Sequence, residues 1–405
     1  MSEALPLPVV ERGFTSHAIV IANRVLKPLD QSPTAFAELT VGAHRLALLK
    51  DGGETFPAML AAIAGARRAI CFETYIFRSD RTGARFAEAL AERARAGVEV
   101  SFLYDAWGSS VSSATLSLLH AAGVRTLAFH PLAFIGQRRA FIGRMTRRDH
   151  KKTLVVDSEV GFTGGINICD DYGPLDGPGW RDTHLRIEGP AVGELEGFFL
   201  HTWRRGGGEP VDPALHVGPT RRVDPAVTVL TSDQHRGRMS IREAYRRAIT
   251  QARERILLTN AYFLPEIRLL RALIAAARRG VDVRVMVPGT TDVPAVLYAS
   301  RSIYELLLDG GVRMFEWKGR VLHAKTAVID GHWSTVGSSN LDLQSLRHNL
   351  EVNAMIDDRG FAGALEAMFT EDLGHCEEIV HERWRRRPLW TRAISWGAYL
   401  LRDWL

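Results

Sequence analysis

Two short stretches of this sequence decide the fold. Residues 149–157 read DHKKTLVVD and residues 322–330 read LHAKTAVID, so both contain the pattern His-x-Lys-x4-Asp. Side chains two residues apart on a β-strand point to the same face, so each histidine emerges together with its lysine. The apolar residues that follow anchor each strand in a core. One such pattern means little, but two copies in one chain are not expected by chance.

The sequence around both motifs also repeats. The recurring landmarks are residues 62–70 with 248–256, 75–77 with 262–264, 96–100 with 279–283, 123–125 with 311–313, and finally the two motifs themselves. Helical patterns alternate with short β-branched runs, which is typical of α/β proteins. A single duplication differs from a solenoid, which needs shorter periods and at least three units. We therefore predict two pseudo-symmetric α/β lobes, each a mixed β-sheet flanked by helices.

A turn rich in glycine or serine follows each motif and ends in asparagine. These turns read TGGIN at 163–167 and VGSSN at 336–340. Backbone N–H groups and an asparagine amide at the mouth of a sheet suit phosphate oxygens. The candidate site therefore combines both histidines and lysines with these amides: His150, Lys152, Asn167, His323, Lys325 and Asn340.

The composition is that of an ordinary globular protein, which excludes collagen-like, coiled-coil and wholly disordered chains. The chain has 405 residues, of which 46% are hydrophobic and 24% are charged. We expect no membrane-spanning helix and no signal peptide. Cys71, Cys169 and Cys376 lie far apart without a metal-binding pattern, so a disulfide framework and a zinc site are not expected. The net charge of +5 favours anionic partners.

The motifs and turns resemble the phospholipase D superfamily, whose hallmark is two HxKxxxxD motifs meeting at one active site between two lobes. Within it, the sequence is most similar to bacterial cardiolipin synthases of the type without N-terminal transmembrane helices. Supporting segments are ETYIF at 73–77, DYGP at 171–174 and WRDTHLRIEGP at 180–190. The resemblance covers roughly residues 40–375 and implies two phospholipase D-like lobes that share one active site.

The resemblance also implies a mechanism without metal or cofactor. A neutral imidazole attacks a phosphodiester to give a phosphohistidine, and a second, protonated imidazole donates to the leaving alkoxide. By analogy His150 is the nucleophile and His323 the general acid and base, although the near-symmetric motifs leave that order open. Lysines and asparagines stabilise the phosphoryl charge.

Carboxylates should complete the site. A nucleophilic histidine needs a carboxylate on its other ring nitrogen to fix the tautomer. Asp182 and Glu351 follow the two motif histidines at equivalent places and are the candidates, with surface acids as the alternative. Asp157 and Asp330 complete the motifs but lie too far along the strand to reach the same phosphate, so we expect a structural hydrogen-bonding role. Glu73 has no assigned function.

The chain divides into five parts. Residues 1–40 form an N-terminal segment, 41–205 the first lobe, 206–222 a glycine- and proline-rich linker, 223–375 the second lobe, and 376–405 an amphipathic tail. In the tail, Trp390, Ile394, Leu401 and Trp404 fall near helical spacing beside an arginine cluster, which is typical of helices at a membrane surface. A helix docked on the core is the alternative. The stretch 130–149 mixes aromatic residues with arginines in the same way.

The expected activity is transfer of a phosphatidyl group from one phospholipid to the hydroxyl of phosphatidylglycerol. Expected partners are phosphatidylglycerol, phosphatidylethanolamine as an alternative donor, and an anionic membrane surface, with no nucleic acid. The expected location is peripheral, on the cytoplasmic side of the inner membrane. Phospholipase D hydrolysis, phosphatidylserine synthase-like transfer and an HKD-type nuclease are the alternatives, because identical residues serve all of them. Oligomeric state stays open.

Overall fold

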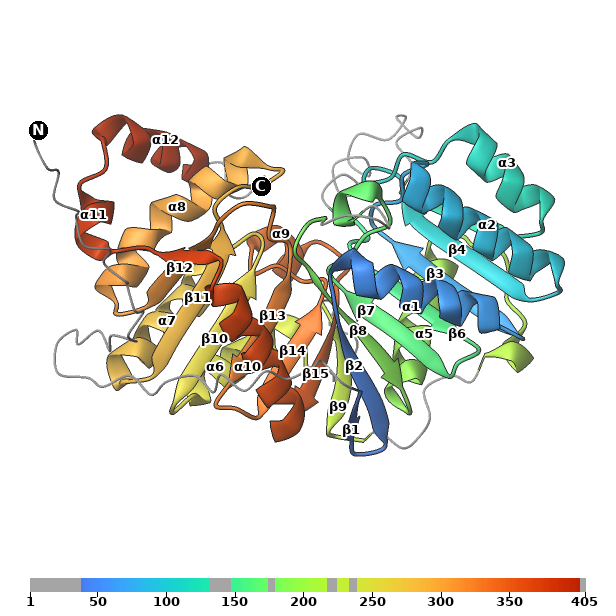
Figure 1. Ribbon diagram of the computed structural model, residues 1–405, viewed down its shortest axis with the longest axis horizontal. Coiled ribbons are helices and arrows are strands. Elements are labelled where there is room, and N and C mark those ends of the chain that lie inside the picture. The colour runs from blue at the N-terminus through green and yellow to red at the C-terminus, as the bar shows by residue number, and fades with distance from the viewer. Residues whose placement is uncertain (1–37, 131–146, 174–178, 217–223, 233–238, 401–405) are drawn as a thin grey trace, which may run out of the picture.

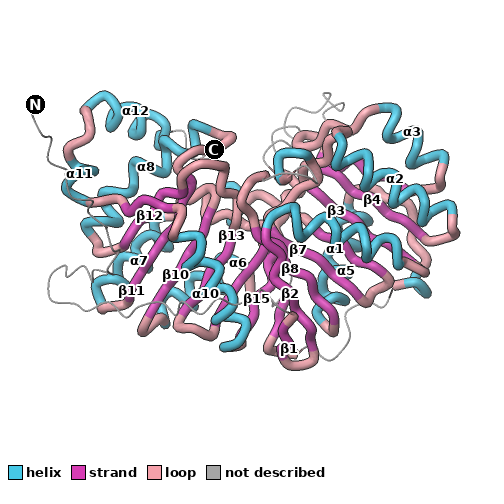
Figure 2. The backbone as a smooth tube through the Cα atoms, in the orientation of Figure 1, coloured by secondary structure: helices cyan, strands magenta, loops and turns pink. Residues whose placement is uncertain are grey.

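A computed structural model of the protein describes residues 38–130, 147–173, 179–216, 224–232 and 239–400. The segment 1–37, most of the stretch 130–149, and Leu401 and Trp404 of the predicted tail lie outside these residues. Two lobes lie side by side, the first coloured blue to green and the second yellow to red in Figure 1. Each contains one β-sheet with helices packed on its faces (Figure 2).

The first sheet has the strand order β1–β2–β8–β7–β6–β3–β4–β5 among the described residues. Its strands are β1 Leu39–Val41, β2 His44–Lys50, β3 Ala69–Thr74, β4 Glu99–Asp105, β5 Arg125–Phe129, β6 Thr153–Val156, β7 Val160–Gly164 and β8 Thr183–Glu188. Its helices are α1 Asp51–Gly65, α2 Arg81–Arg95, α3 Ser113–Ala121 and α5 Ala191–Arg205, with short 3₁₀ turns at Asp170–Tyr172 and Pro213–Leu215.

The second sheet has the order β16–β12–β11–β10–β13–β14–β15–β9. Its strands are β9 Val227–Thr231, β10 Arg255–Asn260, β11 Asp282–Pro288, β12 Arg313–Trp317, β13 Lys325–Ile329, β14 Trp333–Gly337, β15 Val352–Asp357 and β16 Cys376–Glu378. Its helices are α6 Ile241–Gln251, α7 Ile267–Arg279, α8 Pro294–Asp309, α9 Leu343–Arg347, α10 Arg359–Leu373, α11 His381–Arg385 and α12 Leu389–Leu400.

The two sheets have the same topology once β1 and β16 are set aside. The order β2–β8–β7–β6–β3–β4–β5 matches β9–β15–β14–β13–β10–β11–β12, and both sheets contain parallel and antiparallel pairs. The predicted duplication and mixed α/β fold are therefore confirmed. Because β16 pairs with β12, the second sheet extends to Glu378 and takes in the first residues of the predicted tail.

The lobes also share a hydrophobic core. One cluster of buried side chains runs from α5 of the first lobe, including Val192 and Phe199, to Val352 and Phe361 of the second. A common core fixes the orientation of the two sheets, because separating the lobes would expose this apolar surface to water. Side chains from opposite lobes can therefore be held in one site with little freedom.

Candidate active site

The two motif histidines lie where the lobes meet. His150 precedes β6 and His323 precedes β13. The His150 backbone N–H donates to Leu350 O at 2.9 Å, and the His323 N–H donates to Arg181 O at 2.7 Å. Each histidine-bearing segment is thus tied to the other lobe, at the residue just before that lobe's candidate carboxylate.

The candidate carboxylate of each lobe contacts the motif histidine of the other lobe. His150 Nδ1 lies 2.9 Å from Glu351 Oε1, and His323 Nδ1 lies 2.7 Å from Asp182 Oδ2. Both predicted carboxylates therefore contact a motif histidine, and each serves the histidine of the opposite lobe. A carboxylate on Nδ1 orients the ring so that Nε2 is presented to a ligand.

The lysines and asparagines surround the same place. Lys152 Nζ donates to His150 O at 2.7 Å, and Lys325 Nζ lies 3.0 Å from His323 Nε2. Asn167 Oδ1 accepts from Ile76 N at 3.0 Å, and Asn340 Oδ1 accepts from Tyr262 N at 3.4 Å. Each asparagine oxygen is thus held by the loop after β3 or β10, and both asparagines line the cavity over the histidines. The Asn167 amide donates to the Tyr172 hydroxyl at 2.8 Å.

Asp157 and Asp330 lie at the far ends of β6 and β13, away from the histidines. Asp157 accepts from the backbone N–H groups of residues 67–69, and Asp330 accepts from those of residues 253–255. Both residues have a positive φ, 55° and 52°. Their contacts join a tight turn to the preceding helix–strand connection, as expected of a structural role, and they do not face the cavity.

A cavity of about 740 Å³ opens over both histidines. Both asparagines line it, together with a ring of aromatic and polar side chains that includes Tyr75, Trp107, Arg148, Tyr172, Trp180, Tyr262 and Asp292. The Tyr75 ring packs edge-on against His150 at 4.7 Å, and the Tyr172 ring packs edge-on against His323 at 5.5 Å. Sequence reasoning missed these aromatic residues as site residues. Tyr75 and Tyr172 lie inside segments that carry the family resemblance, which was their only signal.

Burial sets the protonation of the site. It lowers the pKa of His150 well below 6.5, and the charges of Lys152 and Lys325 act in the same direction. The pKa of His323 is also lowered by burial, but the carboxylate of Asp182 opposes the shift. Burial lowers the pKa of Lys152 to about 7 and that of Lys325 to about 8. A bound phosphodiester anion would restore the charge of both lysines.

A cluster of buried charged side chains lies beside the motif of the first lobe. Lys151 is 3% exposed, and its ammonium donates to Glu73 Oε1 at 2.6 Å and to Thr202 Oγ1 at 2.7 Å. Asp149 Oδ1 lies 3.6 Å from the same ammonium. Lys151 points away from the phosphate side because it alternates with His150 and Lys152 along the chain.

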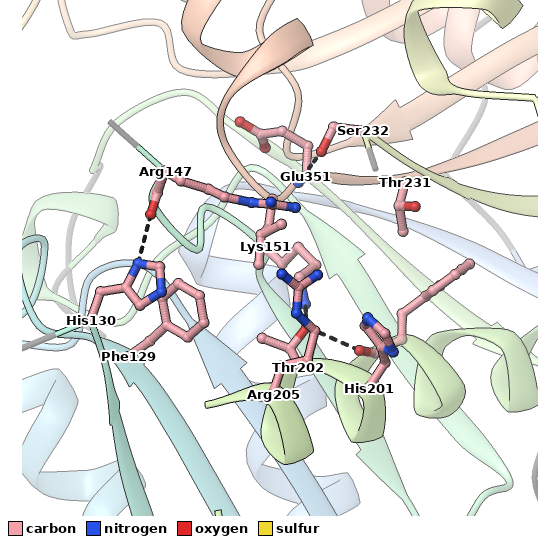
Figure 3. Close-up of a pocket in the computed structure, with 12 residues that line it drawn as sticks. Phe129, His130, Arg147, Lys151, His201, Thr202, Arg205, Thr231, Ser232 and Glu351 are labelled. Atoms are coloured by element: carbon pink, nitrogen blue, oxygen red, sulfur yellow. Dashed lines mark hydrogen bonds between the residues drawn. The ribbon is translucent and has the colours of Figure 1, made fainter. Parts of the chain in front are cut away.

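Lys151 instead lines a smaller cavity of about 80 Å³ between the lobes (Figure 3). Thr202 and Arg205 reach it from α5, whereas Ser232 and Glu351 reach it from the second lobe. Ser232 Oγ accepts from the Glu351 N–H at 3.0 Å. The backbone that presents Glu351 to His150 is therefore itself held by a residue at the end of β9.

Comparison with known proteins shows the family of the chain. The family model "Cardiolipin synthase, PLD-like domain" matches residues 245–373. The chain is 36% identical to the cardiolipin synthase of Geobacillus kaustophilus over 386 residues, covering 93% of this chain and 74% of the relative. It is 34% identical to cardiolipin synthase B of Salmonella typhimurium, covering 88% of this chain and 87% of the relative. The chain belongs to the cardiolipin synthases of the phospholipase D superfamily.

As a member of this family, the chain is a phosphatidyltransferase that acts on phospholipids. Its fold also resembles the crystal structure of phosphatidylserine synthase from Haemophilus influenzae, with a TM-score of 0.67, 13% identity, and coverage of 91% of this chain and 97% of that one. The motif histidines of both lobes and both asparagines line one cavity.

The described part of this synthase family member contains no helix long and apolar enough to cross a bilayer. The predicted tail helix forms as α12 and packs against α8, where Arg392 donates to Glu305 at 3.3 Å. Trp390 is nevertheless 67% exposed and Trp396 is 59% exposed. One face of the tail helix therefore docks on the core, while apolar side chains stay exposed, and membrane contact of the tail stays a prediction.

Proposed function

We propose that this protein makes cardiolipin by moving a phosphatidyl group from a donor phospholipid to a hydroxyl of phosphatidylglycerol. The observation that carries the proposal is the crossed pair of histidine–carboxylate contacts on one cavity. Two imidazoles oriented in this way can divide a phosphodiester exchange into two displacements. The family membership supports a lipid substrate.

In the first displacement, Nε2 of His150 attacks phosphorus, and the bond from phosphorus to the headgroup oxygen breaks. His323 donates its Nε2 proton to the departing alkoxide. The causes of the pKa shifts support this order, because the charges of both lysines add to burial in keeping His150 neutral, whereas Asp182 favours the imidazolium of His323. A positioned acid of this kind contributes about 10²–10⁴-fold to the rate.

In the second displacement, the now neutral His323 accepts the proton of the incoming hydroxyl. The hydroxyl oxygen attacks phosphorus, the bond between phosphorus and Nε2 breaks, and His150 is regenerated. Lys152, Lys325, Asn167 and Asn340 bind the non-bridging oxygens throughout and stabilise the developing charge. Metal and cofactor are not used in these steps.

We further propose that the protein works peripherally on an anionic membrane, at the cytoplasmic face of the inner membrane. The support is α12, whose Leu389, Trp390, Ile394, Trp396 and Leu400 are exposed. Residues 383–387 read RWRRR and lie just before this helix. Tryptophan and arginine together favour the interface, at about 1 kcal/mol per basic residue near anionic lipid.

The test is mass spectrometry of lipids after the full chain is incubated with phosphatidylglycerol vesicles, with and without phosphatidylethanolamine. Cardiolipin that disappears in His150→Ala and His323→Ala supports the synthase, and dependence on phosphatidylethanolamine names the donor. Phosphatidic acid alone means that water is the acceptor and contradicts the synthase. A phosphatidyl ester of another added alcohol, such as serine, points to that transferase. Cleavage of single-stranded DNA without lipid turnover would favour a nuclease.

Membrane contact is tested separately by co-sedimentation with phosphatidylglycerol vesicles. Deleting residues 389–405 should weaken binding, and Trp390→Ala with Trp396→Ala should do so while keeping the helix. A matched control is Ile267→Ala, since Ile267 is 51% exposed but lies on α7. Unchanged sedimentation of the tail variants would reject α12 as the contact.

A further inference from the structure

A cluster of three side chains lies behind the first sheet, apart from the cavity over the motif histidines. Cys71 comes from β3, Glu196 from α5, and His216 from the segment that joins the lobes. Their sulfur, oxygen and nitrogen atoms all lie within 4.8 Å of one another. Cys71 Sγ is 3.9 Å from His216 Nδ1, and Glu196 Oε1 is 2.8 Å from the same nitrogen. Cys71 and Glu196 are each 1% exposed.

The outer nitrogen of His216 is already engaged. His216 Nε2 lies 3.1 Å from Glu99 Oε1, and Glu99 is in turn paired with Arg125 at 2.5 Å. Histidines that bind metals through one ring nitrogen usually donate the other N–H to a carboxylate, which fixes the tautomer and the ring orientation. The ring of His216 is thus arranged to present Nδ1 to the other two ligands.

A fourth polar atom lies beside this cluster. Ser101 on β4 is in register with Cys71 on β3, so both side chains lie on the same face of the sheet. Ser101 Oγ is buried and has no hydrogen-bond partner among the described residues. An unpartnered hydroxyl costs free energy in a dry interior unless a water or ligand satisfies it. A water on a bound ion would do so.

We propose that Cys71, Glu196 and His216 form a site for a divalent metal ion of the Zn²⁺ class, with a water in the fourth position. Sulfur, imidazole and carboxylate ligands together suit Zn²⁺. Bonds of the usual length in a tetrahedral site place ligand atoms about 3.3–3.7 Å apart. The observed separations bracket this range, so small side-chain shifts complete the geometry.

The charges also balance. A thiolate and the Glu196 carboxylate neutralise a doubly charged ion, while Glu99 is neutralised by Arg125. Without metal, His216 Nδ1 lies 2.8 Å from Glu196 Oε1 and Nε2 lies 3.1 Å from Glu99 Oε1. Because metal ligands bind in their deprotonated forms, the affinity for the ion must fall as the pH falls.

The site would attach the inter-lobe segment to the back of the first lobe. His216 is separated from Cys71 by 145 residues and from Glu196 by 20, so the sequence showed no metal pattern. The ion would hold His216 against β3 and α5 of the first lobe. Its role is structural, because none of its three ligands lines either cavity described above.

The test uses the full-length chain, stripped with a chelator and titrated with Zn²⁺ alone or Co²⁺ alone. We expect one ion per chain, a rise in melting temperature with Zn²⁺, and a thiolate-to-metal charge-transfer band with Co²⁺. Cys71→Ser should abolish the band, and His216→Gln should weaken binding at least tenfold. Cys169→Ser is the matched control, since Cys169 is a buried thiol elsewhere in the same lobe.

Two results would overturn the site. One is a stripped protein whose melting temperature and cobalt spectrum do not change on adding metal, which would leave an imidazolium ion pair as the role of the cluster. The other is a cobalt band that survives Cys71→Ser, which would place the metal elsewhere. If His216→Gln proves unstable, the spectrum of Cys71→Ser still decides the question, because serine preserves the packing.

Discussion

The two motif sites share one plan but lie in different electrical surroundings. Strand register places Glu73 of the first lobe at the position of Thr259 in the second, since each pairs with the threonine that follows the motif lysine. Asp149 and Lys151 of the first motif correspond to Leu322 and Ala324 of the second. The first motif therefore has charged residues at these positions, whereas the second has uncharged ones. The two lobes share the contacts that orient the histidine rings but differ in the charges near them.

The turns after the two motifs also differ in how they contact the carboxylates. A side chain at Gly165 would place its Cβ 2.1 Å from Asp182 Oδ1, so only glycine fits beside this carboxylate. The equivalent Ser338 instead donates its hydroxyl to Glu351 Oε2 at 2.5 Å. Each lobe therefore combines its own carboxylate and turn residue to reach the same result, a histidine held at Nδ1.

The largest expected effect separates the roles of the two histidines. His150→Ala and His323→Ala should each lower kcat by at least about 10⁴-fold with a natural lipid. With a phosphatidyl donor whose leaving group is nitrophenolate, departure needs no proton. His323→Ala should then accumulate a covalent phosphatidyl-enzyme, visible by intact-protein mass spectrometry, and His150→Ala should not. An adduct that forms on His150→Ala instead would reverse the assignment.

Replacing the crossed carboxyl groups should have the next largest effect. Glu351→Gln and Asp182→Asn each remove the carboxyl group that fixes an imidazole, and we expect kcat to fall about 10²–10⁴-fold with little change in melting temperature. The loss in Asp182→Asn should shrink with the nitrophenolate donor, but the loss in Glu351→Gln should not. Glu382→Gln, exposed on α11, is the control. Equal responses of both variants to the donor would contradict the asymmetric roles.

The buried charges of the first lobe can be tested by copying the second lobe. Lys151→Ala leaves Glu73 without its cation and should lower the free energy of unfolding by about 3–5 kcal/mol. The triple variant Glu73→Thr, Asp149→Leu, Lys151→Ala carries the second lobe's residues and should recover most of that loss. Urea denaturation followed by circular dichroism measures both. A triple variant no more stable than Lys151→Ala would show that residues outside this cluster also depend on these charges.

The pH dependence should show the smallest effect, about tenfold per unit on each limb. His150 must be neutral to attack, and burial lowers its pKa below 6.5, so kcat/KM should rise with pH only in the acid range. His323, whose pKa is also lowered by burial, loses the proton that it donates to the leaving group as the pH rises. The lysines, with pKa values of about 7 and about 8, then lose their charge, so kcat/KM should fall. Assays in nonionic micelles avoid changes in membrane charge. A rate that still rises above pH 8 would show that His150 is not held neutral.

Much of this protein could be predicted from its sequence. Strand and helix periodicity predicted the duplicated α/β lobes, because such patterns are local. The motifs predicted His150 and His323 at one cavity, and equivalent placement singled out Asp182 and Glu351. Aromatic lining residues such as Tyr172 were missed, because a sequence does not distinguish a tyrosine of the core from a tyrosine of the site. Only the structure shows that the Tyr172 hydroxyl lies 3.0 Å from His323 Nδ1.

The sequence by itself determined the duplication, the residue types of the site and the family, since each depends on residues close together in the chain. Only the tertiary structure decided which carboxylate serves which histidine. His150 and Glu351 are 201 residues apart, and His323 and Asp182 are 141 apart. Nothing local couples positions so distant. Their pairing follows from two similar sheets packed around one core, which brings the start of each motif strand to the carboxylate of the other lobe.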